Sequence, residues 1–370
     1  MDGRIDELIR MAAARPDTIT LGGGLPAREL FPRRALTEAF VRTMTDPGCA
    51  ALQYGWPEGS EGLRAWVAQR LARRGAAVEP DDVLITSGAQ QALAIAAQIL
   101  FRPGDRIGCD PESYPAALDL FRARGLLPTP SSTGVAGFYA MPAIGNPRGL
   151  GLDDRAREAL LARARLLRTP ILEDDAYAEL RFAGPPPRPL LADDRRFVFH
   201  VGTLSKTLCP GLRVGWLVAP RRYRRRAVEA KHASDLQANS LAQALLEDFL
   251  ARTDYDALVE RARRFYSRRA KALARALRAH LPSFRFTEPA GGFTIWVETD
   301  REGDDAALLE TAIRRGVSFD PGRSFRVDGR SAPIALRLSF AVEPAPRIAL
   351  GVERLARAWS AYQREARRAA

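Results

Sequence analysis

The sequence predicts an α/β fold in which a large domain, with a mainly parallel sheet between helices, is followed by a smaller α+β domain. From residue 83 to residue 218, short apolar segments alternate with helix-length amphipathic segments. This pattern is typical of a parallel sheet covered by helices. After about residue 227 the segments become long and helix-like, and only two strand candidates follow. A chain of 370 residues is long enough for one large and one small domain.

Each expected element rests on its own local pattern. Val83–Thr86 is an apolar run that enters a turn at Ser87-Gly88 and then an Ala/Leu/Gln-rich stretch to Leu100. This order predicts a strand, a turn and a helix. The same reasoning predicts further strands at 106–109, 170–173, 197–201, 214–218, 292–297 and 334–340, and helices at 114–124, 254–280 and 346–369.

We divide the chain into three parts. Residues 1–45 are expected to pack on the small domain, because the alternating pattern of the sheet begins only after them. Residues 46–265 then form the large domain, and residues 266–370 form the small one.

The charge is unusual because it comes almost entirely from arginine. The net charge is +12, with fifty-three arginines and lysine only at positions 206, 231 and 271. The densest basic run, 221–226 around Tyr223, has neither an aromatic-rich RNA motif nor zinc-finger spacing beside it. We therefore expect a solvated helix face there and no nucleic-acid partner. Any chemistry that needs an amine side chain has three candidates.

Cysteine, histidine and hydropathy narrow the class of protein. Cys49, Cys109 and Cys209 are too few and too scattered for a disulfide framework or a metal site, which favours a reducing cytoplasm. His200 lies in an apolar run and is expected to be a packed strand residue. No apolar segment reaches the roughly 18 residues needed to cross a membrane, and the N-terminus lacks the apolar core of a signal peptide.

Lys206 stands out among the three lysines. It follows a buried strand, beside the hydroxyls of Thr203 and Ser205, and Arg213 comes seven residues later. An aldehyde cofactor needs an amine whose pKa is lowered by its surroundings, and a phosphate needs hydroxyls and a guanidinium. The alternative is a lysine at a strand end that extends into water. Lys231 and Lys271 lie among charges in helix-like stretches, so a solvated helix face is expected for both.

Two further strand ends carry groups that fit such a cofactor. Residues 87–90 form a junction of small residues between a strand and a helix, where the helix N-terminus favours binding of an anion. A plain turn between strand and helix would have the same sequence pattern. In 173–177 one of three consecutive carboxylates could hold a protonated pyridine nitrogen, and Tyr177 ends the segment. A metal site and a simple strand-end cap remain open for these acids. Residues 146–149 close a further strand candidate, and Asn146 offers an amide at the same sheet edge. Tyr114 could stack on a flat ring or lie in the core.

Together, in this order and spacing, these segments resemble the fold-type I pyridoxal-phosphate enzymes of the class I/II aminotransferase family, from about residue 21 to the C-terminus. Within that family the chain is similar to the branch of 2-aminoadipate aminotransferases and the effector domains of MocR-type regulators. The resemblance implies a seven-stranded sheet. It is also carried by the segments 21–26, 31–32, 52–55, 57–59, 231–235, 291–296, 321–322 and 337–340.

The resemblance implies a role for each catalytic residue. Lys206 would form a Schiff base with pyridoxal 5′-phosphate and then move the proton at the reacting carbon. Asp174 would pair with the pyridinium, Tyr177 and Asn146 would bind the phenolic O3′ oxygen on the ring, and Tyr114 would stack on the ring. The phosphate would be held by Ser87, Gly88, Ala89, Gln90, Thr203, Ser205 and Arg213.

The resemblance also implies partners. Arg337, together with Asn146 and the backbone of Gly24, would bind the α-carboxylate of an amino acid or a 2-oxo acid. Tyr54 would reach the phosphate of a neighbouring subunit, which implies a homodimer with shared sites. No metal is implied.

The chain departs from the family pattern at three positions. Arg148 replaces the threonine of the usual Asn-Pro-Thr-Gly, Gly145 replaces a common Gln or His, and Ala89 stands where some members have a hydroxyl residue. These changes are expected to leave cofactor binding intact and to leave the identity of the substrate open.

The expected function is amino-group transfer between an L-amino acid and a 2-oxo acid by a ping-pong Schiff-base mechanism. The alternative within enzymes keeps the cofactor and ends in oxidation or hydroxylation, decarboxylation or elimination. A ligand-sensing regulator domain is the third candidate. It would need a helix-turn-helix domain, and only about 20 residues precede the first family motif.

Overall fold

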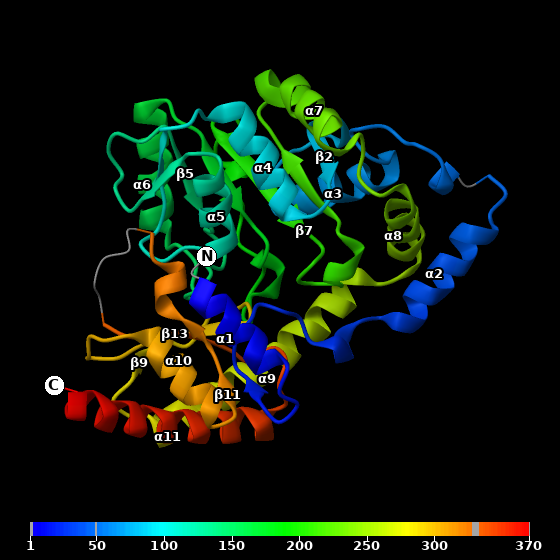
Figure 1. Cartoon of the computed structure of the whole chain (residues 1–370). Helices are drawn as coiled ribbons and strands as arrows, with labels where there is room; N and C mark the ends of the chain where they lie inside the picture. The colour runs from blue at the N-terminus through cyan, green and yellow to red at the C-terminus, as the bar shows by residue number, and fades with distance from the viewer. Residues whose placement is uncertain (1–2, 49, 328–332, 370) are drawn as a thin grey trace.

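The computed structural model describes residues 3–48, 50–327 and 333–369, and Figure 1 shows a larger part above a smaller one. The larger part contains a seven-stranded sheet in the order β2-β8-β7-β6-β5-β3-β4. Only β8 is antiparallel to its neighbours, β2 and β7. The predicted mainly parallel sheet of seven strands is therefore confirmed. The strands are β2 Val83–Thr86, β3 Arg106–Gly108, β4 Leu127–Thr129, β5 Gly137–Ala140, β6 Ile171–Asp174, β7 Val198–Thr203 and β8 Gly215–Val218.

The sheet is buried on both faces, which explains why its central strands read as continuous apolar runs. Alternate residues point to opposite sides, so Leu172 and Phe199 join one hydrophobic core while Ile171 and Val198 join the other. The first core is shared with helices α4 Ala89–Leu100, α5 Pro115–Ala123 and α7 Arg221–Asp235. The second is shared with α3 Glu61–Arg73, α6 Asp154–Leu167 and α8 Ser240–Arg252.

The smaller part is built on a four-stranded antiparallel sheet in the order β12-β13-β10-β9. Three helices pack together beside it, as the lower part of Figure 1 shows. The strands are β9 Arg285–Phe286, β10 Thr294–Glu298, β12 Asp320–Pro321 and β13 Ala335–Ser339, and the helices are α9 Tyr255–His280, α10 Asp305–Arg314 and α11 Ala345–Ala369.

The N-terminal segment contacts both parts. Helix α1 Gly3–Ala13 packs on α10, and strand β1 Ile19–Thr20 pairs in parallel with β11 Val317–Ser318 of the smaller part. Helix α2 Arg33–Thr45 instead packs on α8. The proposed boundary at residue 266 falls inside α9, and our three-part division of the chain remains a proposal.

Several short strands were not predicted, and the strand expected before Asn146 ends earlier than expected, as β5, at Ala140. It has four residues and begins at Gly137, where a Cβ atom would lie 2.6 Å from the ring of Phe101. The glycine is required by this close packing, yet in the sequence it lowers the apparent strand propensity. Among the residues that the structure describes, no helix is long and apolar enough to span a bilayer.

The basic run at the start of α7 lies on the surface. The side chains of Arg221 and Arg225 are 81% and 88% exposed. Arg222 lies over the ring of Tyr223, 4.9 Å from its centroid. The expected solvated helix face is confirmed for this run.

Candidate active site

The predicted site residues come together at one edge of the seven-stranded sheet. Strands β2, β6 and β7 run in the same direction and lead to Ser87, Asp174 and Lys206 at their carboxyl ends. Strand β8 is antiparallel, so Arg213, just before it, lies at this same edge. Open α/β sheets bind their ligands at the carboxyl ends of the strands.

The amine of Lys206 points into this edge and not into water. Its Nζ donates to the carbonyl oxygen of Gly24 at 3.0 Å and lies 5.5 Å from the ring centroid of Tyr177. Burial lowers the pKa of Lys206, and the positive charges of Arg337 and Arg213 lower it further. A lowered pKa makes the neutral, nucleophilic amine easier to form. The reading of Lys206 as a solvated strand-end lysine is therefore wrong.

Asp174 is a buried carboxylate at the last position of β6. Its Oδ2 accepts a hydrogen bond from the Tyr139 hydroxyl at 3.0 Å, and its Oδ1 accepts one from the backbone N–H of Ala176 at 3.2 Å. Burial raises the pKa of Asp174 to about 6. A buried carboxylate of this kind is stabilised by a cationic partner, and a protonated ring nitrogen would supply one.

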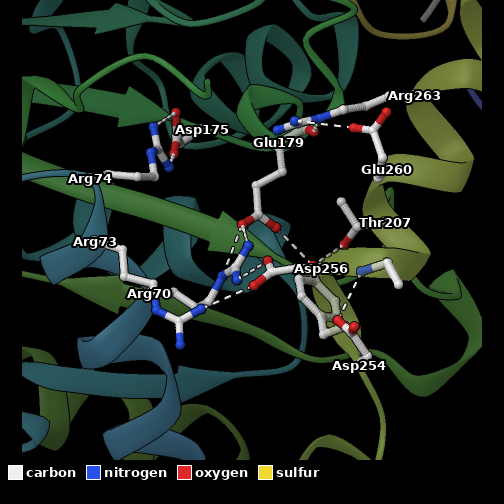
Figure 2. A network of polar contacts seen from close by, with 12 residues as sticks. Arg70, Arg73, Arg74, Asp175, Glu179, Thr207, Asp254, Asp256, Glu260 and Arg263 are labelled. Atoms are coloured by element: carbon white, nitrogen blue, oxygen red, sulfur yellow. Dashed lines mark hydrogen bonds and ion pairs between the residues drawn. The ribbon is translucent and has the colours of Figure 1, made fainter. Parts of the chain in front are cut away.

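The acids on either side of Asp174 are held by the protein. Glu173 accepts from the backbone N–H groups of Leu190 and Leu191 and lies 3.0 Å from Nδ1 of His200, which is fully buried in β7. Asp175 pairs with Arg74, as Figure 2 shows. Glu173 and Asp175 are thus structural. Among the described residues no group of three His, Cys, Asp or Glu side chains could hold a metal.

A cradle suited to a phosphate lies where β2 meets α4. Gly88 has a φ of +86°, a conformation that favours glycine, and a Cβ atom there would lie 2.6 Å from Nη2 of Arg213 and would displace its guanidinium. Nη2 of Arg213 also donates to the Ser87 carbonyl at 3.1 Å. A guanidinium beside a helix N-terminus that begins at Ala89 is a donor set for a phosphate.

The other predicted phosphate ligands surround this cradle, but their side chains differ in what they already bind. The Thr203 hydroxyl lies 2.9 Å from both Ser205 Oγ and the carbonyl oxygen of Val214, so it is used within its own loop. The Gln90 side chain donates to the carbonyl oxygen of Ala116, so one of its two amide N–H donors is already used. The residues present fit the phosphate of pyridoxal phosphate through Arg213, Ser205 and backbone groups.

Lys231 contradicts its sequence-based prediction. It was expected on a solvated helix face, yet it is fully buried and pairs with Asp235. Asp235 also accepts from Ser87 Oγ at 3.2 Å and from Gln91 Nε2 at 2.6 Å. Helix α7 turns this side toward α4, and the many arginines on its other side conceal that face in the sequence. The Lys231–Asp235 pair supports the loop of the cradle.

We expect Asp235→Asn to lower the free energy of unfolding by about 3 kcal/mol, because it leaves the buried ammonium of Lys231 without its carboxylate. Adding Lys231→Met removes that buried charge and is expected to recover part of the loss. Urea unfolding of the single and double variants measures both effects. A single variant as stable as the wild type would show that the pair contributes nothing.

Arg337 lies at the carboxylate end of the site. Its Nη1 donates to Oδ1 of Asn146 at 2.9 Å, and its Nε and Nη2 donate to Oδ2 of Asp320 at 3.0 and 2.7 Å. The contact with Asn146 joins the smaller part to the loop that follows β5. Asp320 was not predicted, and the sequence offers no signal for it, because its contact depends on the register between β12 and β13.

The three predicted tyrosines lie in different surroundings. Tyr177 is buried, packs edge-on against Phe293 at 5.2 Å, and burial raises its pKa to about 12. Tyr114 precedes α5 and lines a cavity of about 280 Å³ together with Tyr139. Tyr54 lies on the surface with 77% of its area exposed. One chain therefore brings Tyr177 and Tyr114 to the site but not Tyr54.

A polar network, shown in Figure 2, includes Thr207, the residue that follows Lys206 in the chain. The Tyr255 hydroxyl lies 2.7 Å from Oγ1 of Thr207, the residue next to Lys206, and 2.8 Å from Glu179. Arg70 of α3 pairs with both Glu179 and Asp256. The network ties Thr207 to helices α3 and α9, and sequence reasoning did not find it.

Arg148, which departs from the family pattern, joins the two parts of the molecule. It pairs with Glu112 at 2.8 Å and with Glu298, at the end of β10, at 3.1 Å. Arg148 therefore has a carboxylate partner in each of the two parts of the molecule.

The chain is similar to a known family and to several known proteins. The profile of a family described as "Aminotransferase class I and II" matches residues 28–132 and 138–355. "Aromatic-amino-acid aminotransferase 1" of Thermococcus litoralis is 31% identical, and the alignment covers 95% of this chain and 90% of that protein.

Two solved structures are similar throughout. The α-aminoadipate aminotransferase of Thermus thermophilus, complexed with N-(5′-phosphopyridoxyl)-L-leucine, has a TM-score of 0.87 at 33% identity, covering 97% of this chain and 96% of its own. The kynurenine aminotransferase of Pyrococcus horikoshii has a TM-score of 0.88 at 30% identity, with 96% and 93% covered.

Proposed function

The chain belongs to the class I and II aminotransferases, and we propose that its active site is the sheet edge where Lys206, Asp174 and Arg213 meet. The enzyme uses pyridoxal phosphate to move an amino group between an amino acid and a 2-oxo acid, as the resemblance had implied. When bound, the cofactor supplies an aldehyde that takes up the amino group and an electron-withdrawing ring. The observation that carries the placement is the amine of Lys206, turned inward beside Tyr177.

The ring of the cofactor would be held by four side chains from three different segments. Asp174 would pair with the ring nitrogen, since its buried carboxylate is suited to a cation. Tyr114 would lie against the ring, and Tyr177 and Asn146 would bind its hydroxyl oxygen. The phosphate would be held by Ser87, Gly88, Ala89, Gln90, Thr203, Ser205 and Arg213, with Thr203 acting through its loop.

Lys206 moves the proton. Its lowered pKa allows Nζ to take a proton from Cα of the amino acid and to give it up again within the same site. Arg337 and Asn146, together with the backbone of Gly24, would bind the α-carboxylate and so hold the Cα–H bond toward the amine. We propose a ping-pong cycle in which the first product leaves before the second substrate binds.

We also propose a homodimer in which Tyr54 completes the partner's site. Leu52, Tyr54 and Trp56 are 76%, 77% and 80% exposed in one chain, and Phe40 and Met44 of α2 are exposed as well. So many exposed large apolar side chains are typical of an interface.

We expect the protein in the cytoplasm, because its cysteines are few and scattered along the chain.

The proposed function is tested by mixing the purified holoenzyme with single amino acids. We expect the absorbance of the bound cofactor to move from the aldehyde band to the amine band with at least one donor, because the first half-reaction needs no second substrate. Absence of this change with every standard amino acid, 2-aminoadipate and ornithine would contradict it. Oxygen uptake, or release of CO₂ or ammonia without the amine form, would indicate the alternative reactions.

A further inference from the structure

The arginine proposed to bind the substrate already has a carboxylate beside it. Asp320 and Arg337 face each other across the β12–β13 pair. A single oxygen, Oδ2 of Asp320, accepts from both Nε and Nη2 of Arg337. Both side chains are largely buried, with 14% and 9% exposed. An anion held this close reduces the positive charge that an incoming carboxylate meets.

The same oxygen also binds the N-terminal segment. The backbone N–H of Gly23 donates to Oδ2 of Asp320 at 2.8 Å. The next residue, Gly24, accepts from Nζ of Lys206. The loop is closely apposed to the aspartate, because a Cβ atom on Gly22 would lie 3.2 Å from Oδ1. Asp320 thus connects Arg337 to the loop that contacts the proposed catalytic lysine.

These contacts fix the plane of the guanidinium. An arginine has five N–H donors in a rigid fork. Asp320 takes the side formed by Nε and Nη2, and Asn146 takes one donor of Nη1. The donors that remain, one on each terminal nitrogen, form the pair that binds a carboxylate in a bidentate manner.

We propose that Asp320 is a positioning residue for the substrate carboxylate. It holds Arg337 so that the two terminal nitrogens face the substrate, and its negative charge limits how tightly carboxylates bind there. This inference rests on the proposed function, because it takes Arg337 as the group that binds the α-carboxylate. Orientation and charge are two separate effects, and substitutions can separate them.

Asp320→Asn keeps an oxygen acceptor and removes the charge, so we expect the KM for the amino donor to fall about tenfold with kcat little changed. Asp320→Leu removes the acceptor too, so Arg337 loses its fixed orientation and the KM is expected to rise about tenfold. The Kd of propionate, a carboxylate without an amino group, should move in the same directions when titrated against each holoenzyme. Glu353→Gln removes a carboxylate from another arginine pair, on α11, and is expected to change neither constant.

If the KM of both Asp320 variants shifts in the same direction, or if the KM of neither variant shifts, the proposal is overturned. If the leucine variant does not fold, the asparagine variant decides alone, and an unchanged or higher KM overturns the proposal. The half-reaction of the wild-type enzyme separates a failure of the proposed function from a failure of the role of Asp320. Its absence would overturn the proposed function, whereas its presence without the opposite shifts would overturn only the role of Asp320.

Discussion

Lys206→Ala is expected to reduce the rate of the half-reaction with an amino donor by about 10⁴-fold, the upper end of what one positioned proton-transfer group contributes. The reason is that no other amine can take its place. Lys231 is fully buried and paired with Asp235, and Lys271 lies exposed on α9. Single-turnover absorbance after mixing variant and donor measures the effect, and gel filtration measures whether the cofactor is still retained.

Lys271→Ala is the matched control, because it removes an exposed lysine from the same chain. We expect its half-reaction rate and its cofactor retention to equal those of the wild type. If Lys206→Ala kept the wild-type rate, the assignment of the active site to this sheet edge would be wrong. If it lost the rate but bound cofactor normally, the lysine would serve proton transfer and not retention.

Much of the fold could be predicted because several strands are buried on both faces. Val83–Thr86 and Ile171–Asp174 are fully buried strands that begin with apolar residues and end at a turn, a pattern that the sequence shows directly. Strands such as β4 and β12 have only three and two residues and contain proline. They are strands because neighbouring strands pair with them, and that information lies outside the segment itself.

The site shows the same division. Lys206, Arg213 and Asp174 could be predicted because each follows or precedes a recognisable strand and carries a chemistry that its neighbours lack. Tyr139 could not be predicted. It reaches Asp174 only because the register between β5 and β6 pairs Tyr139 with Leu172, two residues before Asp174. Asp320 depends in the same way on strand pairing. Lys231 was placed wrongly because charge along a helix does not reveal which side packs.

Asp174→Asn is expected to slow the half-reaction by about 10²–10³-fold, the loss typical of removing one preorganised electrostatic group. The uncharged amide cannot stabilise a protonated ring nitrogen, so the ring withdraws electrons less well. Single-turnover absorbance measures the rate, and titration of the cofactor-free protein with pyridoxal phosphate measures the accompanying fall in affinity. A rate within tenfold of the wild type would contradict the pairing of Asp174 with the ring.

The same substitution is expected to stabilise the cofactor-free protein. The folded-state pKa of Asp174 is raised to about 6, so the folded protein holds this proton to a higher pH than the unfolded chain does. The stability that this proton contributes is complete below the ordinary pKa of an aspartate and is lost as pH rises through about 6. Near pH 8 the buried charge therefore costs about 3 kcal/mol, and asparagine avoids that cost.

Thermal unfolding of the two cofactor-free proteins at pH 5 and pH 8 tests this linkage. We expect the variant to unfold at a higher temperature than the wild type at pH 8, with a smaller difference at pH 5. Asp175→Asn is the contrasting control, because it breaks the buried pair with Arg74 and should destabilise the protein at both pH values. An Asp174→Asn protein less stable than the wild type at pH 8 would mean that the carboxylate contributes to folding. The opposite result would mean that Asp174 is retained for the cofactor at the expense of the stability of the cofactor-free protein.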